Sequence, residues 1–225
     1  MPIERPDRIR GATTDRPAAC VAALPPSIGA TRLVAVDGIG GSGKTTFADA
    51  LAARLGGAPV VRLDDFARPG DFFGWLPRLR AQLLEPLARH EAARCDTYDW
   101  AGYRISGYSE VPAAPVVILE GVGAARRELG PVTALRVHVD TPAELAAART
   151  LDRDGPELAW FWRLWRAAET EHLARDRPWT RPHLRVDGAD ARGGSGTEPD
   201  RRALAGSGSR RSPSTARRDD AGYAG

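Results

Sequence analysis

The residues with the clearest chemical meaning lie in the segment VAVDGIGGSGKTTFADAL, residues 34–51. Gly38 to Thr45 fit the pattern G-x-x-x-x-G-K-[ST], in which the backbone N–H groups of a glycine-rich loop surround phosphate oxygens. An apolar run precedes the loop and an amphipathic helical pattern follows it, as this kind of loop requires. The segment therefore predicts a nucleotide-binding site. The residues expected to bind the nucleotide are Gly38, Gly40, Gly41, Ser42, Gly43, Lys44, Thr45 and Thr46.

Lys44 is the only lysine of the chain, although lysine and arginine together number 32. A compact ammonium group fits inside a tight ring of backbone groups, whereas a planar guanidinium does not. The sequence thus keeps a lysine where an arginine would not fit. We expect Lys44 to reach the β- and γ-phosphates of ATP and to stabilise their charge during transfer. Thr45 is expected to offer its hydroxyl to Mg²⁺.

Carboxylates follow two further apolar runs. Asp64 and Asp65 end the run at 59–65, and Glu120 ends the run at 115–120. In a parallel sheet these ends lie beside the phosphate loop, so a carboxylate there can orient Mg²⁺ or accept the proton of an attacking hydroxyl. Asp64 and Glu120 are therefore candidates for serving the metal, and the pair Asp64 and Asp65 also offers a candidate for the base. A helix cap or solvated turn for the aspartates, and a solvated strand end for Glu120, are the alternatives.

The elements that must position these residues alternate between strand and helix patterns. Strands are expected at 32–37, 59–65, 115–121, 135–140 and 183–188, and helices at 44–55, 76–90, 142–151 and 156–175. We expect Pro86 to bend or divide the second helix and Thr141 to cap the third. Apolar strands that alternate with helices predict a three-layer α/β fold, in which helices cover both faces of a parallel sheet.

The last of these helices carries an apolar stripe followed by polar residues on the same face. The stripe consists of Leu158, Phe161, Trp162 and Trp165. Its spacing is typical of a helix face buried in the core. Glu169 and His172 lie one turn further on and have no second set of metal-ligand spacings. We therefore interpret both as interface or salt-bridge residues.

Composition divides the chain into three parts. Residues 1–30 are rich in Pro, Ala and Arg and are expected to form a loose lead-in with one short helix, while residues 31–188 hold the domain. Residues 189–225 contain almost no large apolar side chains. They cannot bury enough surface to offset the entropy of ordering, so we expect them to be disordered.

Charge and cysteine content restrict the class of protein. The net charge is +3, and residues 189–225 supply about +2 of it because they hold seven arginines and five acids. The rest of the chain is therefore nearly neutral, and its charge is only a weak argument for nucleic-acid binding. Cys20 and Cys95 have no metal-binding spacing, and the sequence has neither a secretory signal nor a run of the ~20 apolar residues that span a bilayer. These features predict a reduced, cytoplasmic protein without a membrane or nucleic-acid partner.

The motifs GIGGSGKTT, LDDF, YDW, ILEG and RTLDRDG together resemble the uridine kinase/phosphoribulokinase group of P-loop kinases, over about residues 32–188. The likeness is greatest to small bacterial uridine-kinase-like proteins. The phosphate loop occurs in many NTPases, whereas DDF and EG point to this group. The resemblance implies ATP and Mg²⁺ as cofactors, the general base at Asp64 and the acid near Mg²⁺ at Glu120. It also implies a small lid whose Arg149 and Arg153 close over the transferred phosphoryl group and exclude water.

The segment TYDWAGY, residues 97–103, resembles the nucleoside-binding stretch of the same group. Tyr103 occupies the position of the group's base-contacting histidine, and the group's Asp-His-Pro segment is absent, with Asp71 as the nearest acid. The resemblance therefore implies a nucleoside-like acceptor with altered contacts. The residues expected to bind the acceptor are Asp65, Phe66, Tyr98, Asp99, Trp100 and Tyr103.

The sequence as a whole predicts a kinase that transfers a phosphoryl group from Mg·ATP to a hydroxyl of a small, nucleoside-like molecule. Two alternatives stay open. One is a kinase of another small metabolite, such as a sugar, a vitamin alcohol or a nucleotide monophosphate. The other is a nucleotide-dependent switch, or an ATPase without a small-molecule acceptor. The oligomeric state and the choice between ATP and GTP are not determined by the sequence.

Overall fold

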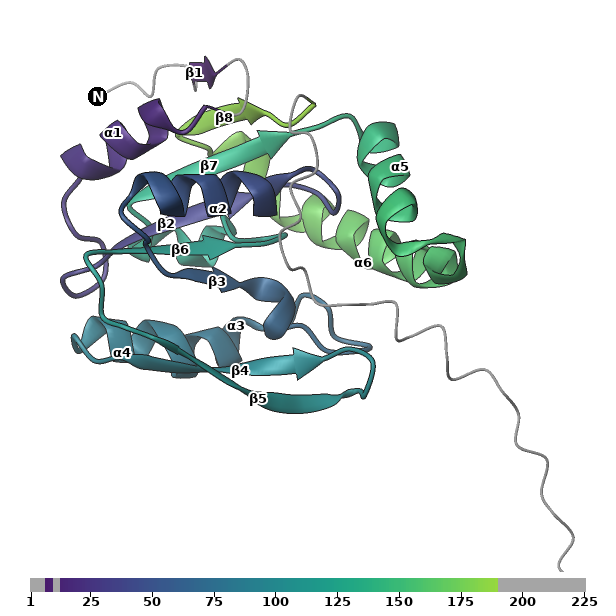
Figure 1. Ribbon diagram of the computed structural model, residues 1–225, viewed down its shortest axis with the longest axis horizontal. Helices are drawn as coiled ribbons and strands as arrows, with labels where there is room; N and C mark the ends of the chain where they lie inside the picture. Colours follow the sequence, from purple (N-terminus) through teal and green to yellow (C-terminus); the bar gives the residue numbers. More distant parts are fainter. Residues whose placement is uncertain (1–6, 10–12, 190–225) are drawn as a thin grey trace, which may run out of the picture.

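The computed structural model describes residues 7–9 and 13–189, so the tail expected to be disordered lies outside the described residues from position 190 onward. Six parallel strands form the main sheet in the order β1-β8-β7-β2-β6-β3 (Figure 1). The strands are β1 (Asp7–Ile9), β2 (Arg32–Asp37), β3 (Val60–Arg62), β6 (Val116–Glu120), β7 (Leu135–Asp140) and β8 (Leu184–Asp187). The expected α/β fold with a parallel sheet is confirmed.

Helices cover both faces of this sheet. α1 (Asp15–Ala23) and α2 (Lys44–Arg54) pack on one face, and α3 (Leu76–Leu79) and α4 (Glu85–Ala88) pack on the other. The remaining helices, α5 (Ala143–Asp154) and α6 (Ala159–Asp176), lie between β7 and β8 in the chain. Successive side chains of β2 point to opposite faces. Val34 and Val36 pack in the same cluster as Phe47 of α2, whereas Leu33 and Ala35 belong to the cluster that contains α3 and α4.

The helix expected at 76–90 is interrupted. A π-helical turn at Arg80–Leu84 separates α3 from α4. Pro86 has no N–H to donate to the carbonyl of Gln82, and the thiol of Cys95 donates to this carbonyl instead, at 3.8 Å. The bend or division expected at Pro86 therefore takes the form of a π turn that ends just before it, while the backbone stays helical on both sides.

Two strands that the sequence patterns do not reveal form a separate antiparallel sheet, β4 (Ala93–Asp99) and β5 (Arg104–Val111). Ala93 and Cys95 of β4 point into the core, while most of β5 is exposed. The amide of Gln82 holds β4 against the π turn, since its nitrogen donates to the Asp96 carboxylate at 2.7 Å and its oxygen accepts the Asp96 N–H at 3.1 Å.

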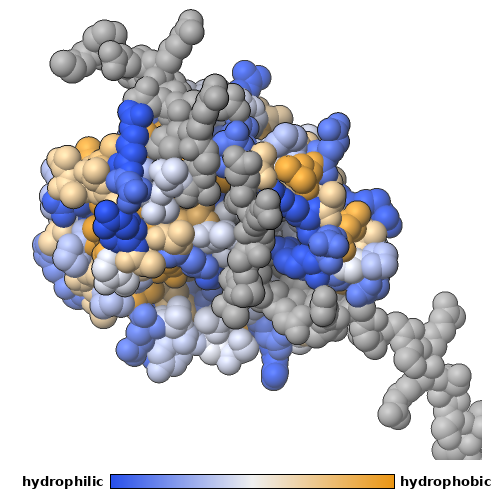
Figure 2. All heavy atoms as spheres, turned by 45° about the horizontal axis from the view of Figure 1, so that its top comes forward, coloured by the Kyte–Doolittle hydropathy of each residue, from blue (hydrophilic) through white to orange (hydrophobic). Residues whose placement is uncertain are grey.

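The segment expected as a loose lead-in contributes α1 and β1. Val21 of α1 is buried in the cluster that α2 and the sheet share, and β1 pairs with β8. On the face shown in Figure 2, hydrophilic and hydrophobic residues are interspersed. Within the described ranges, the structure contains no helix with both the length and the apolar composition needed to cross a bilayer.

Candidate active site

The phosphate loop connects β2 to α2 at the carboxyl edge of the sheet. Gly41 and Gly43 have φ values of +83° and +91°, which glycine adopts without strain. A Cβ at Gly41 would also lie 2.2 Å from the carbonyl oxygen of Ala146 in α5. The glycines therefore serve both the curvature of the loop and the close approach of α5.

Lys44 and Thr45, at the start of α2, meet Glu120 at the end of β6. Lys44 is only 5% exposed, and its Nζ lies 3.9 Å from Glu120 Oε1. The hydroxyl of Thr45 donates to the same oxygen at 3.2 Å. Burial raises the pKa of Glu120, while the positive charge of Lys44 lowers it. Three of the residues that the sequence selected for phosphate and metal binding thus form one buried cluster.

Arg62 is a member of this cluster that the sequence analysis missed. It is the register partner of Glu120 across β3 and β6, and its guanidinium lies 3.4 Å from the Glu120 carboxylate. The same guanidinium is 3.1 Å from Asp49 of α2. The sequence signal for Arg62 was its position directly before the segment LDD. The carboxyl ends of neighbouring parallel strands lie at the same edge of the sheet, so a residue at this position lies near Glu120.

Asp64 and Asp65 lie in a one-turn 3₁₀ helix, Leu63–Asp65, that follows β3. Asp64 acts electrostatically on both Glu120 and Asp65 and raises the pKa of each. Asp65 Oδ1 accepts the N–H of Tyr98 at 3.4 Å, and burial is the main cause that raises the pKa of Asp65 to about 6. Asp64 is thus coupled electrostatically to Glu120, and Asp65 is hydrogen-bonded to Tyr98 of β4.

The donor set beside the loop fits Mg²⁺. Thr45 and Glu120 supply adjacent oxygen atoms, and Asp64 is electrostatically coupled to Glu120. Mg²⁺ prefers oxygen ligands and is usually bound through one or two carboxylates together with substrate phosphates and water. Among the residues that the structure describes, no group of three or more His, Cys, Asp or Glu side chains is placed to hold a metal ion.

Asp37, the last residue of β2, is a second buried acid that the sequence analysis passed over. Its Oδ1 accepts the N–H groups of Gly38 at 2.7 Å and Gly123 at 3.1 Å, and its Oδ2 accepts the N–H of Ala125 at 2.8 Å. Burial raises its pKa to about 6, against the lowering effect of these hydrogen bonds. Asp37 thereby joins the phosphate loop to the loop after β6. The only signal in the sequence was its position before the first loop glycine.

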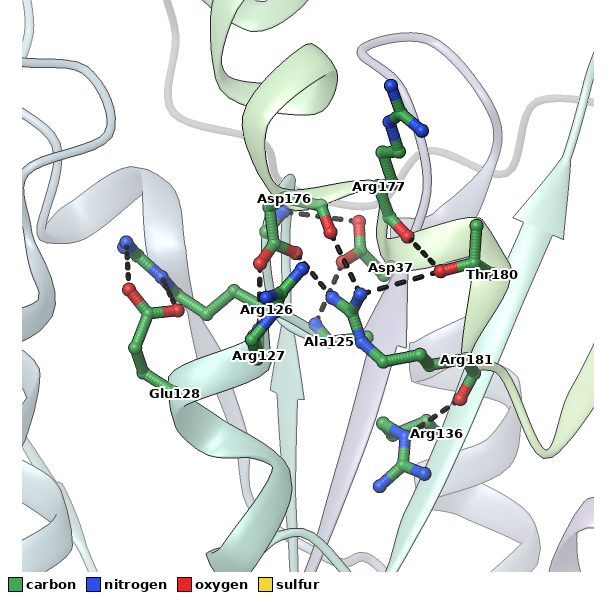
Figure 3. A network of polar contacts seen from close by, with 11 residues as sticks. Asp37, Ala125, Arg126, Arg127, Glu128, Arg136, Asp176, Arg177, Thr180 and Arg181 are labelled. Atoms are coloured by element: carbon green, nitrogen blue, oxygen red, sulfur yellow. Dashed lines mark hydrogen bonds and ion pairs between the residues drawn. The ribbon is translucent and has the colours of Figure 1, made fainter.

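Helix α6 is fixed to the same loops by its buried polar residues. At its end, Asp176 accepts the N–H of Arg127 at 2.9 Å and pairs with the guanidinium of Arg181 at 2.9 Å (Figure 3). Nearer its middle, Glu169 Oε1 accepts the N–H of Gly40 at 2.7 Å, and the ring of His172 stacks on Phe73 with centroids 4.7 Å apart.

The interpretation of Glu169 and His172 as interface or salt-bridge residues is therefore wrong. Glu169 bonds to a backbone N–H of the phosphate loop, and His172 packs on an aromatic ring inside the fold. Thr141 also differs from expectation, because its hydroxyl donates to the carbonyl of Ser42 at 2.8 Å and does not cap α5.

The two arginines expected in the lid have partners within the fold. Arg149 donates to the carbonyl oxygens of Gly188 at 2.8 Å and Ala189 at 2.7 Å. Arg153 makes two hydrogen bonds to Asp154, at 2.7 and 2.9 Å. The structure thus holds both guanidinium groups in contacts within the fold.

The residues expected to bind the acceptor are divided between the interior and the surface. Phe66 is buried, and Tyr98 and Trp100 are 7% and 2% exposed, with their rings packed edge-to-face at 5.1 Å. Asp99 accepts the N–H groups of Ala101 and Gly102 and so shapes the turn between β4 and β5. Tyr103 lies in that turn with φ of +52° and is 51% exposed. Asp65 and Tyr98 are thus brought together, and Tyr103 lies in the exposed turn of the hairpin.

A cavity of about 850 Å³ opens between α6 and the loops that contain residues 70–74 and 126–128. Phe72, Phe73, Arg126 and His172 are among its lining residues, together with Asp71. Arg126 is held there by Glu128 at 3.0 Å (Figure 3). It also donates to the carbonyl of Phe73 at 3.2 Å. Volumes of this size are typical of small-molecule sites.

Comparison with known proteins identifies the fold. No protein-family model matches the sequence, and no curated protein matches it significantly. Among solved structures, a possible uridine kinase from Bacillus stearothermophilus is similar with a TM-score of 0.57 and 19% identity, over 77% of this chain and 97% of the other. A candidate fructose transport system kinase from Silicibacter sp. TM1040 is similar with a TM-score of 0.55 and 24% identity, over 77% and 98%. The chain therefore shares the α/β fold of these kinase-like proteins.

Proposed function

We propose that this protein transfers the γ-phosphoryl group of Mg·ATP to a hydroxyl of a small molecule. The observation that carries the proposal is that Glu120 Oε1 is shared by Lys44 Nζ and Thr45 Oγ1. A lysine, a hydroxyl and a carboxylate in this arrangement supply a phosphate contact and metal ligands next to a backbone anion site. The kinase descriptions of both structural neighbours add support.

Within this proposal each residue of the cluster has one role. Thr45 and Glu120 would hold Mg²⁺, which neutralises charge on the phosphates when it is bound. Lys44 would contact the transferred phosphoryl group, and Arg149 and Arg153 would stabilise its charge after they leave their present partners. Asp64 would accept the proton of the attacking hydroxyl, because it adjoins Asp65 and acts electrostatically on Glu120.

The role of Asp64 is tested by Asp64→Asn, which removes the base and keeps the shape of the side chain. Turnover should fall at least 100-fold, since general bases contribute about 10²- to 10⁴-fold, while ATP affinity should change little. Asp15→Asn is the matched control, because Asp15 is an exposed carboxylate that pairs with Arg54 away from the loop. Turnover close to wild type in Asp64→Asn would remove Asp64 from the role of base.

For the acceptor we propose a nucleoside-like molecule, on the strength of the aromatic residues beside Asp65. A different small metabolite is the second candidate, and a specific observation favours it. Tyr98 and Trp100 are already buried in aromatic packing, and Asp99 is used by the hairpin turn. These side chains therefore have to rearrange before they can bind a base.

A screen of ADP release distinguishes these candidates. The purified protein is given Mg·ATP with nucleosides, sugars, vitamin alcohols and nucleotide monophosphates, and each phosphorylated product is identified by mass spectrometry. Stimulation by a nucleoside supports the first candidate, and stimulation by another class supports the second. ADP release that no acceptor changes would favour an ATPase or switch and would contradict the proposed phosphoryl transfer.

A further inference from the structure

Helix α6 places a carboxylate on the phosphate loop. Glu169 Oε1 lies 2.7 Å from the backbone nitrogen of Gly40, 129 positions earlier in the chain. Backbone N–H groups of such a loop normally bind phosphate oxygens. A carboxylate oxygen is the group in proteins that most resembles a phosphate oxygen in charge and hydrogen-bonding capacity. Glu169 therefore occupies a donor of the loop as a ligand anion would.

Gly40 is enclosed by the face of α6 that carries Glu169. Gly40 is buried, and Glu169 is 7% exposed. A Cβ on Gly40 would lie 3.1 Å from the ring of Trp162 and 3.3 Å from that of Trp165. Both rings belong to the same face of α6 as Glu169. A phosphate oxygen can reach this N–H only if Glu169 moves away from it.

The charges around Glu169 agree with this exchange. Burial raises the pKa of Glu169, while the N–H of Gly40, Lys44 of α2 and the indole and guanidinium of Trp165 and Arg166 on α6 lower it. The carboxylate is thus stabilised by the same lysine and the same loop that would stabilise a phosphate. A nucleotide phosphate that enters the loop competes for both and repels the carboxylate.

We propose that Glu169 is a positioning residue that acts as an internal anion for the phosphate loop, bound to Gly40 in the nucleotide-free protein and displaced by a nucleotide phosphate. The inference rests on the proposed function only in that it requires the loop to bind a nucleotide. It assigns to α6 a position that depends on whether the nucleotide is bound.

The displacement has a route to the rest of the molecule. His172 lies one turn beyond Glu169 on α6 and borders the cavity beside Phe73. The end of the helix is fixed by the bonds of Asp176 to Arg127 and Arg181 (Figure 3). A movement of the middle of α6 therefore alters the wall of the cavity while the end of the helix stays attached. Nucleotide binding and cavity shape are linked in this way.

The first test measures nucleotide affinity in Glu169→Gln and Glu169→Ala. The dissociation constants of Mg·AMP-PNP and Mg·ADP are determined by calorimetry, with adenosine as the ligand without phosphate. Glu169→Gln keeps an acceptor for Gly40 but removes the charge, and charge-assisted bonds are roughly twice as strong as neutral ones. Both nucleotides should bind about tenfold more tightly, which corresponds to about 1.4 kcal/mol. Adenosine should be unaffected.

The matched control is Glu144→Gln, which removes an exposed carboxylate from the neighbouring helix α5. Thermal unfolding identifies any variant that fails to fold, and Glu169→Gln is the milder of the two changes. Unchanged or weaker nucleotide affinity in a folded Glu169 variant would overturn the proposal, because it would make Glu169 a purely structural support of the loop.

The second test follows α6 directly by hydrogen exchange of the wild-type protein. Binding of Mg·AMP-PNP should slow exchange in the phosphate loop and accelerate it in the middle of α6, around residues 163–172, because that segment loses its bond to Gly40. The acceleration should be absent in Glu169→Gln. Slower exchange in both segments would contradict displacement. Neither test requires turnover, so a failed acceptor screen and a failed displacement are separate results.

Discussion

The dual role of the loop glycines can be tested with two glycine-to-alanine substitutions that differ in one respect. Gly41 and Gly57 have almost equal φ values, +83° and +84°. A Cβ at Gly57 would meet no atom within 4 Å, whereas one at Gly41 would lie 2.2 Å from Ala146 O and 2.9 Å from Thr150 Cγ2. Gly57→Ala therefore introduces backbone strain alone, and Gly41→Ala introduces the same strain together with a collision against α5.

The magnitudes follow from these two contributions. An alanine in the left-handed region costs roughly 1–2 kcal/mol, so Gly57→Ala should lower the free energy of unfolding by about that amount. At Gly41 the carbonyl of Ala146 belongs to the backbone of a helix and cannot rotate away. The loop and α5 must separate by about 1 Å to restore a normal contact, and overpacking of this kind costs about a further 1–3 kcal/mol. Gly41→Ala should thus cost about 2–5 kcal/mol in total.

Urea unfolding measures both free energies, and calorimetry measures the affinity for Mg·ADP. Gly57→Ala should keep wild-type affinity, because Gly57 lies in the exposed loop after α2. Gly41→Ala should bind at least tenfold more weakly, since the displaced loop no longer directs its N–H groups at one point. Equal destabilisation in the two variants, with full affinity in Gly41→Ala, would refute the argument that α5 is packed directly on the loop.

Three other changes probe the buried charges. Lys44→Arg should reduce Mg·ATP affinity at least tenfold in calorimetry, because the larger guanidinium does not fit the buried position beside Glu120. Glu120→Gln should raise the Mg²⁺ concentration that half-saturates ATP turnover at least tenfold, measured by Mg²⁺ titration, as a neutral amide is a weaker ligand. Burial lowers the pKa of His138 to about 4, so the folded state binds fewer protons than the unfolded state between about pH 4 and 6.5. Stability should therefore rise with pH through this window. The free energy of unfolding in urea should fall between pH 7 and pH 4 by about 3 kcal/mol more in wild type than in His138→Leu.

The sequence was sufficient to predict the part of the site that depends on local pattern and sheet topology. Gly38 to Thr45 form a contiguous motif, and Glu120 ends an apolar strand, so the parallel sheet alone brings them to one edge. Asp64 follows by the same reasoning from the next strand. None of these predictions required knowledge of side-chain packing, and this is why the edge of the sheet could be described before the structure was known.

The remaining contacts depend on how distant elements pack, and no local pattern contains that information. Glu169 meets Gly40 because α6 crosses the loop after the chain has formed three more strands of the main sheet. The β4-β5 hairpin escaped prediction because β5 is exposed almost throughout and lacks an apolar face. For Arg149, family resemblance supplied a role, while the position of the Gly188 carbonyl determines the partner that it has in this structure.

One electrostatic feature links these long-range contacts to the composition of the chain. Asp37, Glu120 and Glu169 come from three different elements, and burial raises the pKa of each one, whereas Lys44 lowers all three. A single compact cation therefore stabilises three buried carboxylates around the phosphate loop. An arginine would have to bring a longer and planar group into the same volume, and its charge would lie further from at least one of the acids. The one lysine of the chain therefore stabilises the acids that surround the phosphate loop, in addition to the phosphate contact proposed for it.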